Sequence, residues 1–353
     1  MSTLVPTMAD VAREAGVSIV TVDRVLNQRA PVRPSTERKV LDAARRLNFA
    51  LGKVQALAAT SPAPQASTAP PQRLAFFLLR SESVFYQEMA NALTTATKAN
   101  SAVSVADIYY FEDLNSQERA DLLLDKGKAY DAIALVSVDH PAINQAVDRL
   151  GESGVRSYAL ITDLTATQCA GYVGLDNRKA GRTAAWSIAR LNKRPGKIGL
   201  LLGDHRFLCQ ELCEISFRSY FREHAGDFRI LETRLTHEDI TQAKRVTSEL
   251  LAEHSDLVGL YVSCGGVEGV LQALRESGRA GQIVVVGHDL TDCTRQGLVD
   301  GTVDVMISMR REEVAKALMD LMGQATPLSP EVTGSGAATS VVLPFDLTTA
   351  ENI

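Results

Sequence analysis

Short apolar runs alternate with segments of helical length along most of this chain, and this alternation restricts the possible folds more than any other feature. Six runs are rich in aliphatic side chains: LAFFLL, DAIALVSV, RSYALI, KIGLLL, LVGLYV and QIVVVG. The segments between them, such as YQEMANALTTATKAN and DITQAKRVTSELLAEH, are long enough for amphipathic helices. Continuously apolar strands separated by helices predict parallel sheets that are covered on both faces.

The same pattern indicates how the body of the chain is divided. It extends over residues 74–345 and is interrupted near residues 164–175. We therefore expect two α/β lobes, with the chain crossing back between them near residue 300, rather than one large sheet. Ligands of such folds bind beyond the carboxyl ends of the strands, so we expect a small-molecule site where the lobes face each other.

A linker separates this body from a small basic head. Residues 61–73, which begin SPAPQASTAPPQ, are rich in Pro, Ala and Ser and predict a semi-stiff, solvated spacer. Residues 1–60 contain nine Lys and Arg against five Asp and Glu, whereas the remainder has 28 against 37. A basic module on an acidic body is typical of a nucleic-acid-binding head, although chance alone can also produce it.

The sequence contains no membrane or secretion signal. No run approaches the roughly 20 apolar residues that a membrane span needs. Asp10, Arg13 and Glu14 fall where a signal peptide requires an apolar region. The five cysteines are an odd number scattered through a long chain, which is typical of reduced thiols. We therefore expect a cytoplasmic protein with no membrane partner.

The start of the head predicts a short helix followed by a sharp turn. Thr7 and Asp10 have the spacing of a capping pattern, in which the hydroxyl accepts from free amides and the carboxylate favours the positive end of the helix dipole. A first helix is expected from about Met8 to Ala15. Gly16 then permits the left-handed or tight backbone of a turn.

Two further helices complete the predicted head, giving a helix-turn-helix. The second is expected over residues 19–27 with Ser18 as its cap, and the third begins near Pro34, which suits a first helical position. The apolar residues expected to form the core of the head are Val11, Ala12, Ala15, Val17, Val22, Val25, Leu26, Val40, Ala43, Ala44 and Leu47.

The outer surface of the second helix suits contact with DNA. With the valines turned inward, Ile19, Val20 and Arg24 project outward. Exposed β-branched side chains can contact a thymine methyl group in a major groove, and an Arg can bond a guanine edge in bidentate fashion. The residues expected to contact phosphates are Thr7, Ser18, Thr21 and Asn27. The alternative is a plain three-helix module that packs on another protein.

The head closely resembles a known family. The segment TMADVAREAGVSIVTVDRVLNQRAPVRPSTERKVLDAARRLNF matches the pattern DVA..AGVS..TV.RVLN of the DNA-binding head of the lactose-repressor family. The resemblance implies a regulator in which Ile19, Val20 and Arg24 contact bases. Two features depart from the pattern. Asp23 stands where the family usually has a Ser that touches phosphate, and FALGKVQALAAT lacks the family's hinge motif.

The body resembles the effector domain of the same family, which is similar to periplasmic sugar-binding proteins. The segments that carry the resemblance are GLDNRKAGRTAAW at 174–186, VVVGHDL at 284–290 and LVDGTVDVMISM at 298–309. The resemblance covers residues 7–325 and implies a two-lobed fold that binds a carbohydrate-like effector. Phe85 and Tyr86 fall where the relatives place rings that stack on the ligand, although a core aromatic pair is the alternative.

Polar residues expected at the cleft include two aspartates. Asp163 and Asp289 each follow an apolar strand, where a carboxylate can accept paired hydroxyl bonds or, alternatively, cap a helix. His140 and Glu211 are further candidates to supply polar groups.

Three cleft positions differ from the sugar-binding relatives: Cys213 replaces an Arg, Ser263 an Asn and Met309 a Gln. We therefore expect ordinary aldohexoses and pentoses to bind poorly, and the effector to be a polyol, a modified sugar or a related metabolite.

No pattern points to catalysis, a cofactor or a metal. CGGVEG at 264–269 lacks the full glycine spacing of a dinucleotide motif, and no phosphate-binding GK[ST] occurs. His205, Cys209 and Cys213 share a helical spacing but lack a fourth ligand. The sequence thus predicts a homodimeric, non-enzymatic regulator, expected to be a repressor, that binds a near-palindromic operator. The alternatives are a small-molecule-binding protein whose head docks a protein partner, and an α/β enzyme.

Overall fold

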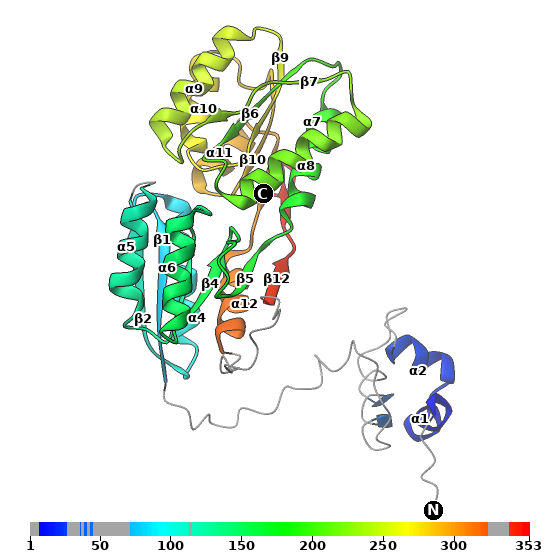
Figure 1. Ribbon diagram of the computed structural model, residues 1–353. Coiled ribbons are helices and arrows are strands. Elements are labelled where there is room, and N and C mark those ends of the chain that lie inside the picture. The colour runs from blue at the N-terminus through cyan, green and yellow to red at the C-terminus, as the bar shows by residue number, and fades with distance from the viewer. Residues whose placement is uncertain are drawn as a thin grey trace, which may run out of the picture. The chain divides into compact units, whose positions relative to one another are not determined.

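The computed structural model describes residues 7–26, 71–112, 115–323 and 339–353. It also describes five positions between the first two ranges: Thr36, Lys39, Val40, Ala43 and Ala44. The chain divides into two compact units, Met1–Ala69 and Pro70–Ile353 (Figure 1). The first includes the residues predicted as the head and most of the expected linker, and the second includes those predicted as the body. The expected hinge and the expected linker up to residue 70 lie outside the described residues.

The head begins with two short helices, α1 (Met8–Ala15) and α2 (Ile19–Leu26). Thr7 caps α1 as predicted: its hydroxyl accepts from the backbone N–H of Asp10, and its own backbone N–H donates to the Asp10 carboxylate at 2.9 Å. Gly16 is left-handed, with φ of 65°. Ser18 Oγ accepts from the backbone N–H of Thr21 at 3.2 Å. These caps and this turn set the angle between the two helices.

A small apolar cluster holds the head together. Its buried members from the first two helices are Val11, Ala12, Val22 and Val25, and its other buried members are Val40, Ala43 and Ala44, which fall in the segment predicted as the third helix. Ala15 and Val17 pack against it. These residues confirm the predicted core, while the side chains of Leu26 and Leu47 lie outside the description.

The first lobe of the body is built on a parallel six-stranded sheet with the order β12-β5-β4-β3-β1-β2. Its strands are β1 (Gln72–Leu79), β2 (Val103–Phe111), β3 (Ala132–Leu135), β4 (Arg156–Leu160), β5 (Cys169–Leu175) and β12 (Thr339–Leu343). In β1 six successive residues, Leu74–Leu79, are buried, so both faces of the sheet are covered.

In the described part of the chain four helices cover this sheet in two pairs, α4 with α12 and α5 with α6. Their bounds are α4 (Val84–Lys98), α5 (Ser116–Gly127), α6 (Pro141–Glu152) and α12 (Arg311–Gly323). Side chains cap the N-termini of two of these helices: Asn115 caps α5 and His140 caps α6. Among the described helices of the whole chain, none is both long and apolar enough to cross a membrane.

The second lobe is built on a seven-stranded sheet with the order β13-β11-β10-β9-β6-β7, in which β8 also pairs with β6. Its strands are β6 (Lys197–Leu202), β7 (Arg229–Ile230), β8 (Arg234–Leu235), β9 (Leu257–Val262), β10 (Val284–His288), β11 (Val305–Ser308) and β13 (Asp346–Thr348). Only β13 runs antiparallel to its neighbour in this sheet of the described chain.

Two apolar clusters pack on this second sheet. One involves α7 (Asn177–Leu191) and α8 (Leu208–His224). The other involves α9 (Ile240–Glu253), α10 (Val267–Glu276) and α11 (Asp292–Val299). The head of helices and the two α/β lobes with parallel sheets are therefore as predicted (Figure 1).

The chain crosses between the lobes at positions that differ from the sequence expectation. The interval suggested for the break, 164–175, includes β5, which still belongs to the first sheet, so the crossing follows Leu175. The return lies near Met309 rather than near 300, because β11 belongs to the second sheet. A third crossing, at residues 344–345, joins β12 to β13, and β13 lies beyond the expected limit of 345. Strand β1 also begins inside the expected linker, at Gln72.

Candidate functional site

The head exposes apolar side chains on the outer face of α2. Ile19 is 52% exposed and Val20 is 59% exposed, while Val22 and Val25 on the same helix are buried. Arg24 is also exposed. Because the core of the head does not use these three side chains, they are free to contact a partner.

The polar residues predicted around this face have local bonding of their own. Ser18 and Thr21 are linked through their hydroxyl oxygens, which lie 2.9 Å apart, and Thr7 serves as the cap of α1. Asp23 is half-buried. Asn27 lies outside the described residues.

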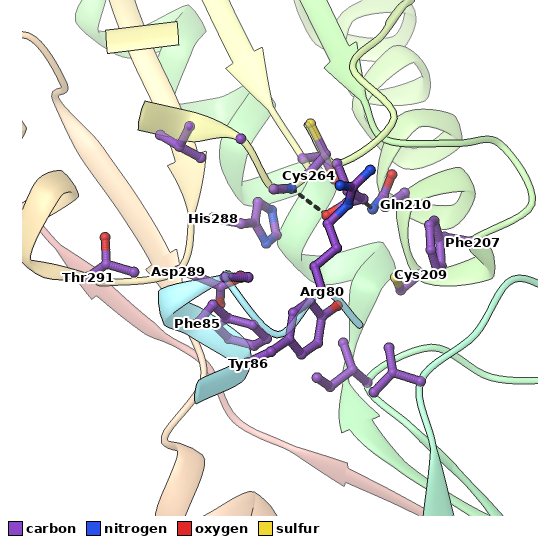
Figure 2. Close-up of a pocket in the computed structure, with 18 of the residues that line it drawn as sticks. Arg80, Phe85, Tyr86, Phe207, Cys209, Gln210, Cys264, His288, Asp289 and Thr291 are labelled. Atoms are coloured by element: carbon purple, nitrogen blue, oxygen red, sulfur yellow. Dashed lines mark hydrogen bonds between the residues drawn. The ribbon is translucent and has the colours of Figure 1, made fainter. Parts of the chain in front are cut away.

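A cavity of about 430 Å³ lies between the two lobes of the body. The first lobe contributes the ends of β1, β3, β4 and β5 and the start of α4. The second lobe contributes the starts of α8 and α10 and the ends of β9, β10 and β11. These are carboxyl ends of parallel strands, where α/β proteins bind ligands. Figure 2 shows Arg80, Phe85 and Tyr86 of the first lobe around the same cavity as His288 and Asp289 of the second.

Two aromatic rings form the wall on the first lobe. The centroids of Phe85 and Tyr86 are 4.9 Å apart, and the rings meet edge to face at 81°. The guanidinium of Arg311 lies 5.1 Å from the centroid of Phe85. Burial raises the pKa of Tyr86 well above its usual value, so the hydroxyl stays protonated and can donate a hydrogen bond.

Asp289 and His288 form the opposite wall at the end of β10. Asp289 has a left-handed backbone, with φ of 69°, which turns its carboxylate toward the cavity. Burial raises the pKa of Asp289 to about 7, an effect that Arg311 opposes and that Glu238 and Glu88 reinforce. Burial lowers the pKa of His288 to about 4, and its Nε2 lies 2.8 Å from the Tyr261 hydroxyl. His288 is therefore neutral at pH 7.

Glu238 enters the cavity from a strained loop of the second lobe. His237 and Glu238 are both left-handed, with φ of 56° and 58°, which is costly for residues with side chains. The Glu238 carboxylate accepts from Gln210 Nε2 at 2.7 Å and from the backbone N–H of Gly265 at 2.9 Å. Burial raises the pKa of Glu238, although these two hydrogen bonds favour the ionised form.

Two small polar side chains of the second lobe, Ser263 and Cys213, also line the cavity. Ser263 is 4% exposed, and its hydroxyl has no hydrogen-bond partner in the described part of the chain. Burial raises the pKa of Cys213 to about 11, and its thiol donates to the carbonyl of Asn177 at 3.3 Å. An unpaired buried hydroxyl is costly, so the Ser263 hydroxyl is suited to bond a polar ligand.

Six of the nine residues predicted for the cleft line this cavity: Phe85, Tyr86, Cys213, Ser263, Asp289 and Met309. The structure does not bring the other three, His140, Asp163 and Glu211, to it.

The three displaced residues have physical reasons for lying elsewhere. His140 caps α6, because its Nδ1 accepts from the backbone N–H of Ala142 at 3.2 Å. The chain turns at Ile161, with φ of 68°, so Thr162 lines the cavity while Asp163 is exposed. On α8 the cavity face carries Gln210 and Cys213, and Glu211 does not share it.

The sequence did not indicate Arg80, Gln210 or Glu238, which also line the cavity. Glu238 follows the two-residue strand β8, which is too short to give an apolar signal. Arg80 directly follows β1, so its place after an apolar run was the one signal that could have identified it. Gln210 lies in the first turn of a helix whose start the sequence left open.

Polar contacts join the lobes around the cavity. Arg80 donates to the carbonyl of His237 at 2.9 Å, and Arg311 donates to the carbonyl of Leu290 at 3.0 Å. On another side the backbone N–H of Asp139 donates to the carbonyl of Arg206 at 2.8 Å. Separation of the lobes would break these bonds.

The thiols and acidic groups are not arranged as a metal centre. Across the described residues, no three His, Cys, Asp or Glu side chains are placed to hold a metal ion. All five cysteines are free thiols.

A helix-turn-helix head joined to a two-lobed domain with an interlobe cavity defines a class of ligand-binding regulators, and comparisons with known proteins agree. Residues 7–50 match the model of bacterial regulatory proteins of the lacI family. Residues 74–326 match the model of a periplasmic binding protein domain. The chain belongs to the lacI family, a family of regulators and not of enzymes, and its body is a periplasmic binding protein domain.

Individual relatives with moderate sequence identity match only part of this chain. A D-ribose/D-allose-binding protein of Pseudomonas aeruginosa is 29% identical over 133 residues, which cover 37% of this chain and 41% of the relative. Catabolite control protein A of Priestia megaterium is 29% identical over 187 residues, 52% of this chain and 51% of the relative. The matches thus span about half of these relatives or less.

The fold of the body has close counterparts among solved structures. A solute-binding protein of an ABC transporter from Agrobacterium vitis, solved with bound D-fucose, aligns with a TM-score of 0.71 at 17% identity. The alignment covers 79% of this chain and 96% of that one. At 17% identity this structural likeness shows a shared fold and does not extend to function.

Proposed function

We propose that this chain is a transcription regulator whose head binds DNA in a sequence-specific way. The observation that carries the proposal is the outer face of α2, where Ile19 and Val20 are exposed beside Arg24. Exposed β-branched side chains are unfavourable in water but suit a thymine methyl group, and the guanidinium fork suits guanine O6 and N7. Thr7, Ser18, Thr21 and Asn27 contact phosphates and fix the register.

The regulator acts as a homodimer on a near-palindromic operator, because two identical heads contact two half-sites related by a two-fold axis. Its membership of a family of regulatory proteins supports this assignment. We propose that it represses transcription and works in the cytoplasm, where the chromosome lies.

The effector is a small polyhydroxylated molecule held between the lobes. The cavity volume, the aromatic pair and the unpaired Ser263 hydroxyl support this. The names of the compared proteins, which include D-ribose, D-allose and D-fucose, point the same way. Cys213, Ser263 and Met309 do not supply the polar anchors usual in sugar-binding relatives. The effector is therefore a polyol, a modified sugar or a related metabolite rather than an ordinary aldohexose or pentose.

Effector binding controls DNA binding through the lobes. A ligand that contacts both walls of the cavity favours the closed arrangement, and only such differential affinity can shift the equilibrium. By linkage, DNA changes the effector affinity by the same factor.

The proposal is tested by selecting duplexes from a random pool with the full chain and measuring affinity by fluorescence anisotropy. Arg24→Ala should weaken binding to the selected duplex by about 1–3 kcal/mol and relax preference at one base pair. Arg13→Ala is the matched control, because Arg13 is an exposed arginine of α1 and its removal deletes the same charge. Arg13→Ala should leave the preference between duplexes unchanged.

Two outcomes would contradict the proposal. If no duplex is enriched over the starting pool, the head does not recognise sequence, and docking of a protein partner becomes the better assignment. If both arginine variants lose affinity equally on selected and scrambled duplexes, Arg24 contributes charge alone.

A further inference from the structure

We propose that the effector carries a cationic nitrogen in addition to its hydroxyl groups, as an amino sugar or an amino polyol does, and that Asp289 and Glu238 bind this nitrogen. The inference rests on the proposed function, in which the interlobe cavity binds the effector, and it narrows the chemical class of that effector.

The cavity has a surplus of negative charge. Its acidic lining residues are Glu82, Glu238, Asp239, Glu268 and Asp289. Among the described lining residues, Arg80 is the only one with a permanent positive charge. That guanidinium is already engaged, since it donates to the carbonyl of His237 and lies 3.4 Å from Glu82 and 4.0 Å from Asp239. Burial raises the pKa of Glu238, and Arg80 and the buried Arg119 oppose that rise, so they offset part of its charge, but neither of them shifts the pKa of Asp289.

The Asp289 carboxylate lacks a partner of its own. No hydrogen-bond donor to its side-chain oxygens occurs within the described chain; the bonds of this residue run through its backbone. Arg311 is the nearest opposing charge, but it does not line the cavity. It pairs with Glu88 at 2.8 Å, donates to the Leu290 carbonyl and lies against Phe85. Asp289 is half-buried, and closure over a ligand would take its carboxylate out of water, which calls for a positive partner from the ligand.

Glu238 adds a second negative charge to the same small space. Its two hydrogen bonds come from neutral groups, the Gln210 amide and the Gly265 backbone, so they orient the carboxylate without cancelling its charge. Glu238 raises the pKa of Asp289, and both carboxylates raise the pKa of Tyr86. The two carboxylates and the Tyr86 hydroxyl therefore lie within electrostatic reach of one another.

A ligand with an ammonium group matches this arrangement better than a neutral one. Closing the lobes over a neutral polyol leaves both carboxylates desolvated without a counter-charge, which is costly. An ammonium group brings three donors and the missing charge, and the faces of Phe85 and Tyr86 also attract a cation. The Ser263 hydroxyl and the Tyr86 hydroxyl remain for the hydroxyl groups of the ligand.

Protonation of Asp289 would also neutralise the cavity. The pH dependence of ligand binding distinguishes this alternative from the binding of an ammonium group. The pKa of Asp289 is raised to about 7, so a neutral ligand that needs a protonated carboxyl would bind more tightly as the pH falls from 8 to 6. An ammonium ligand needs the ionised carboxylate. The binding of glucamine, whose alkylammonium group stays protonated over this interval, should therefore weaken as the pH falls from 8 to 6.

The binding test compares matched pairs on the full chain by thermal shift and calorimetry. The probes are D-glucosamine against D-glucose, D-galactosamine against D-galactose, and glucamine against sorbitol, with N-acetylglucosamine as the uncharged derivative. We expect at least one amine to bind about tenfold to a hundredfold more tightly than its neutral partner. Asp289→Asn should remove that preference. Asp163→Asn, which changes an exposed carboxylate outside the cavity, should preserve it.

A ligand-free measurement tests the charge surplus itself. The folded pKa of Asp289 lies above its unfolded value of 3.8, so the stability linked to its proton is present below pH 4 and lost as the pH rises through about 7. Asp289→Asn should therefore raise the melting temperature of the free protein more at pH 8 than at pH 5. Asp163→Asn should not.

The inference is overturned if the neutral member binds as tightly as its amine in every pair that binds, or if no amine of the panel binds at about 10 mM. It is also overturned if Asp289→Asn gives the same melting difference at both pH values. The DNA selection tests the proposed function separately, so the two failures are distinguishable.

Discussion

The head and the cavity present their functional groups in different ways. In the head, Ile19, Val20 and Arg24 lie on one helix of eight residues, and two caps and one glycine set its angle. In the body, the groups around the cavity come from segments as far apart in sequence as Arg80 and Met309, carried by two lobes. The first is a local surface, whereas the second is assembled from both lobes.

This difference separates the effects expected of substitutions. A change on the outer face of α2 alters contact with DNA and leaves the head folded, because the apolar cluster of the head does not include that face. A change in the cavity also alters the balance between open and closed lobes, because the contacts made by Arg80 and Arg311 join the two. Ligand affinity and closure then change together.

The largest effect is expected from removing the head. The compact unit Pro70–Ile353 should remain folded and keep its ligand-induced melting shift, but its affinity for the selected duplex should fall more than about a thousandfold. Anisotropy and thermal shift on this fragment measure both properties. Retained DNA binding by the body would remove the basis for assigning recognition to α2.

A smaller effect is expected at the crossing of α7 and α8. A Cβ on Gly181 would collide with the carbonyl oxygen of Cys213 and with Ser216 Oγ. Gly181→Ala should therefore lower the free energy of unfolding of the body by about 1–3 kcal/mol, and it should displace Cys213 in the cavity. Urea unfolding measures the first effect and ligand affinity the second. Unchanged stability would show that the helices separate without cost.

The smallest effect is expected at the turn of the head. Gly16 is left-handed, and a Cβ there would meet no other atom, so only the backbone preference opposes a side chain. Gly16→Ala should lower the free energy of unfolding of the head by about 1–2 kcal/mol and leave ligand binding by the body unchanged. Differential scanning calorimetry of the full chain can follow the two units. A change in ligand affinity would show that the units are not independent in this respect.

The head could be predicted from its sequence because short-range rules determine it. The Thr7 cap, the Gly16 turn and the spacing of Val11, Val22 and Val25 specify both helices and their buried faces. The remaining positions of α2, which the core does not bury, are then expected to be exposed.

The cavity could be predicted only in part. Residues that directly follow an apolar strand, such as Asp289, were found because parallel strands end at one edge. Asp163 was misplaced because the left-handed turn at Ile161, a β-branched residue, has no sequence signal. Glu238 was missed because strained loop geometry, rather than any periodic pattern, brings it to the cavity.

The central claim is that recognition of DNA is local to α2 and separate from the cavity. The most direct test is the ratio of affinities for the selected and scrambled duplexes, measured for ligand-free wild type, Arg24→Ala and Asp289→Asn. We expect the ratio to fall about tenfold or more in Arg24→Ala. Asp289→Asn acts on DNA only through the balance of the lobes, so it should change the affinities for both duplexes by the same factor and leave their ratio at the wild-type value. An unchanged ratio in Arg24→Ala, or an equal loss in both variants, would contradict the claim.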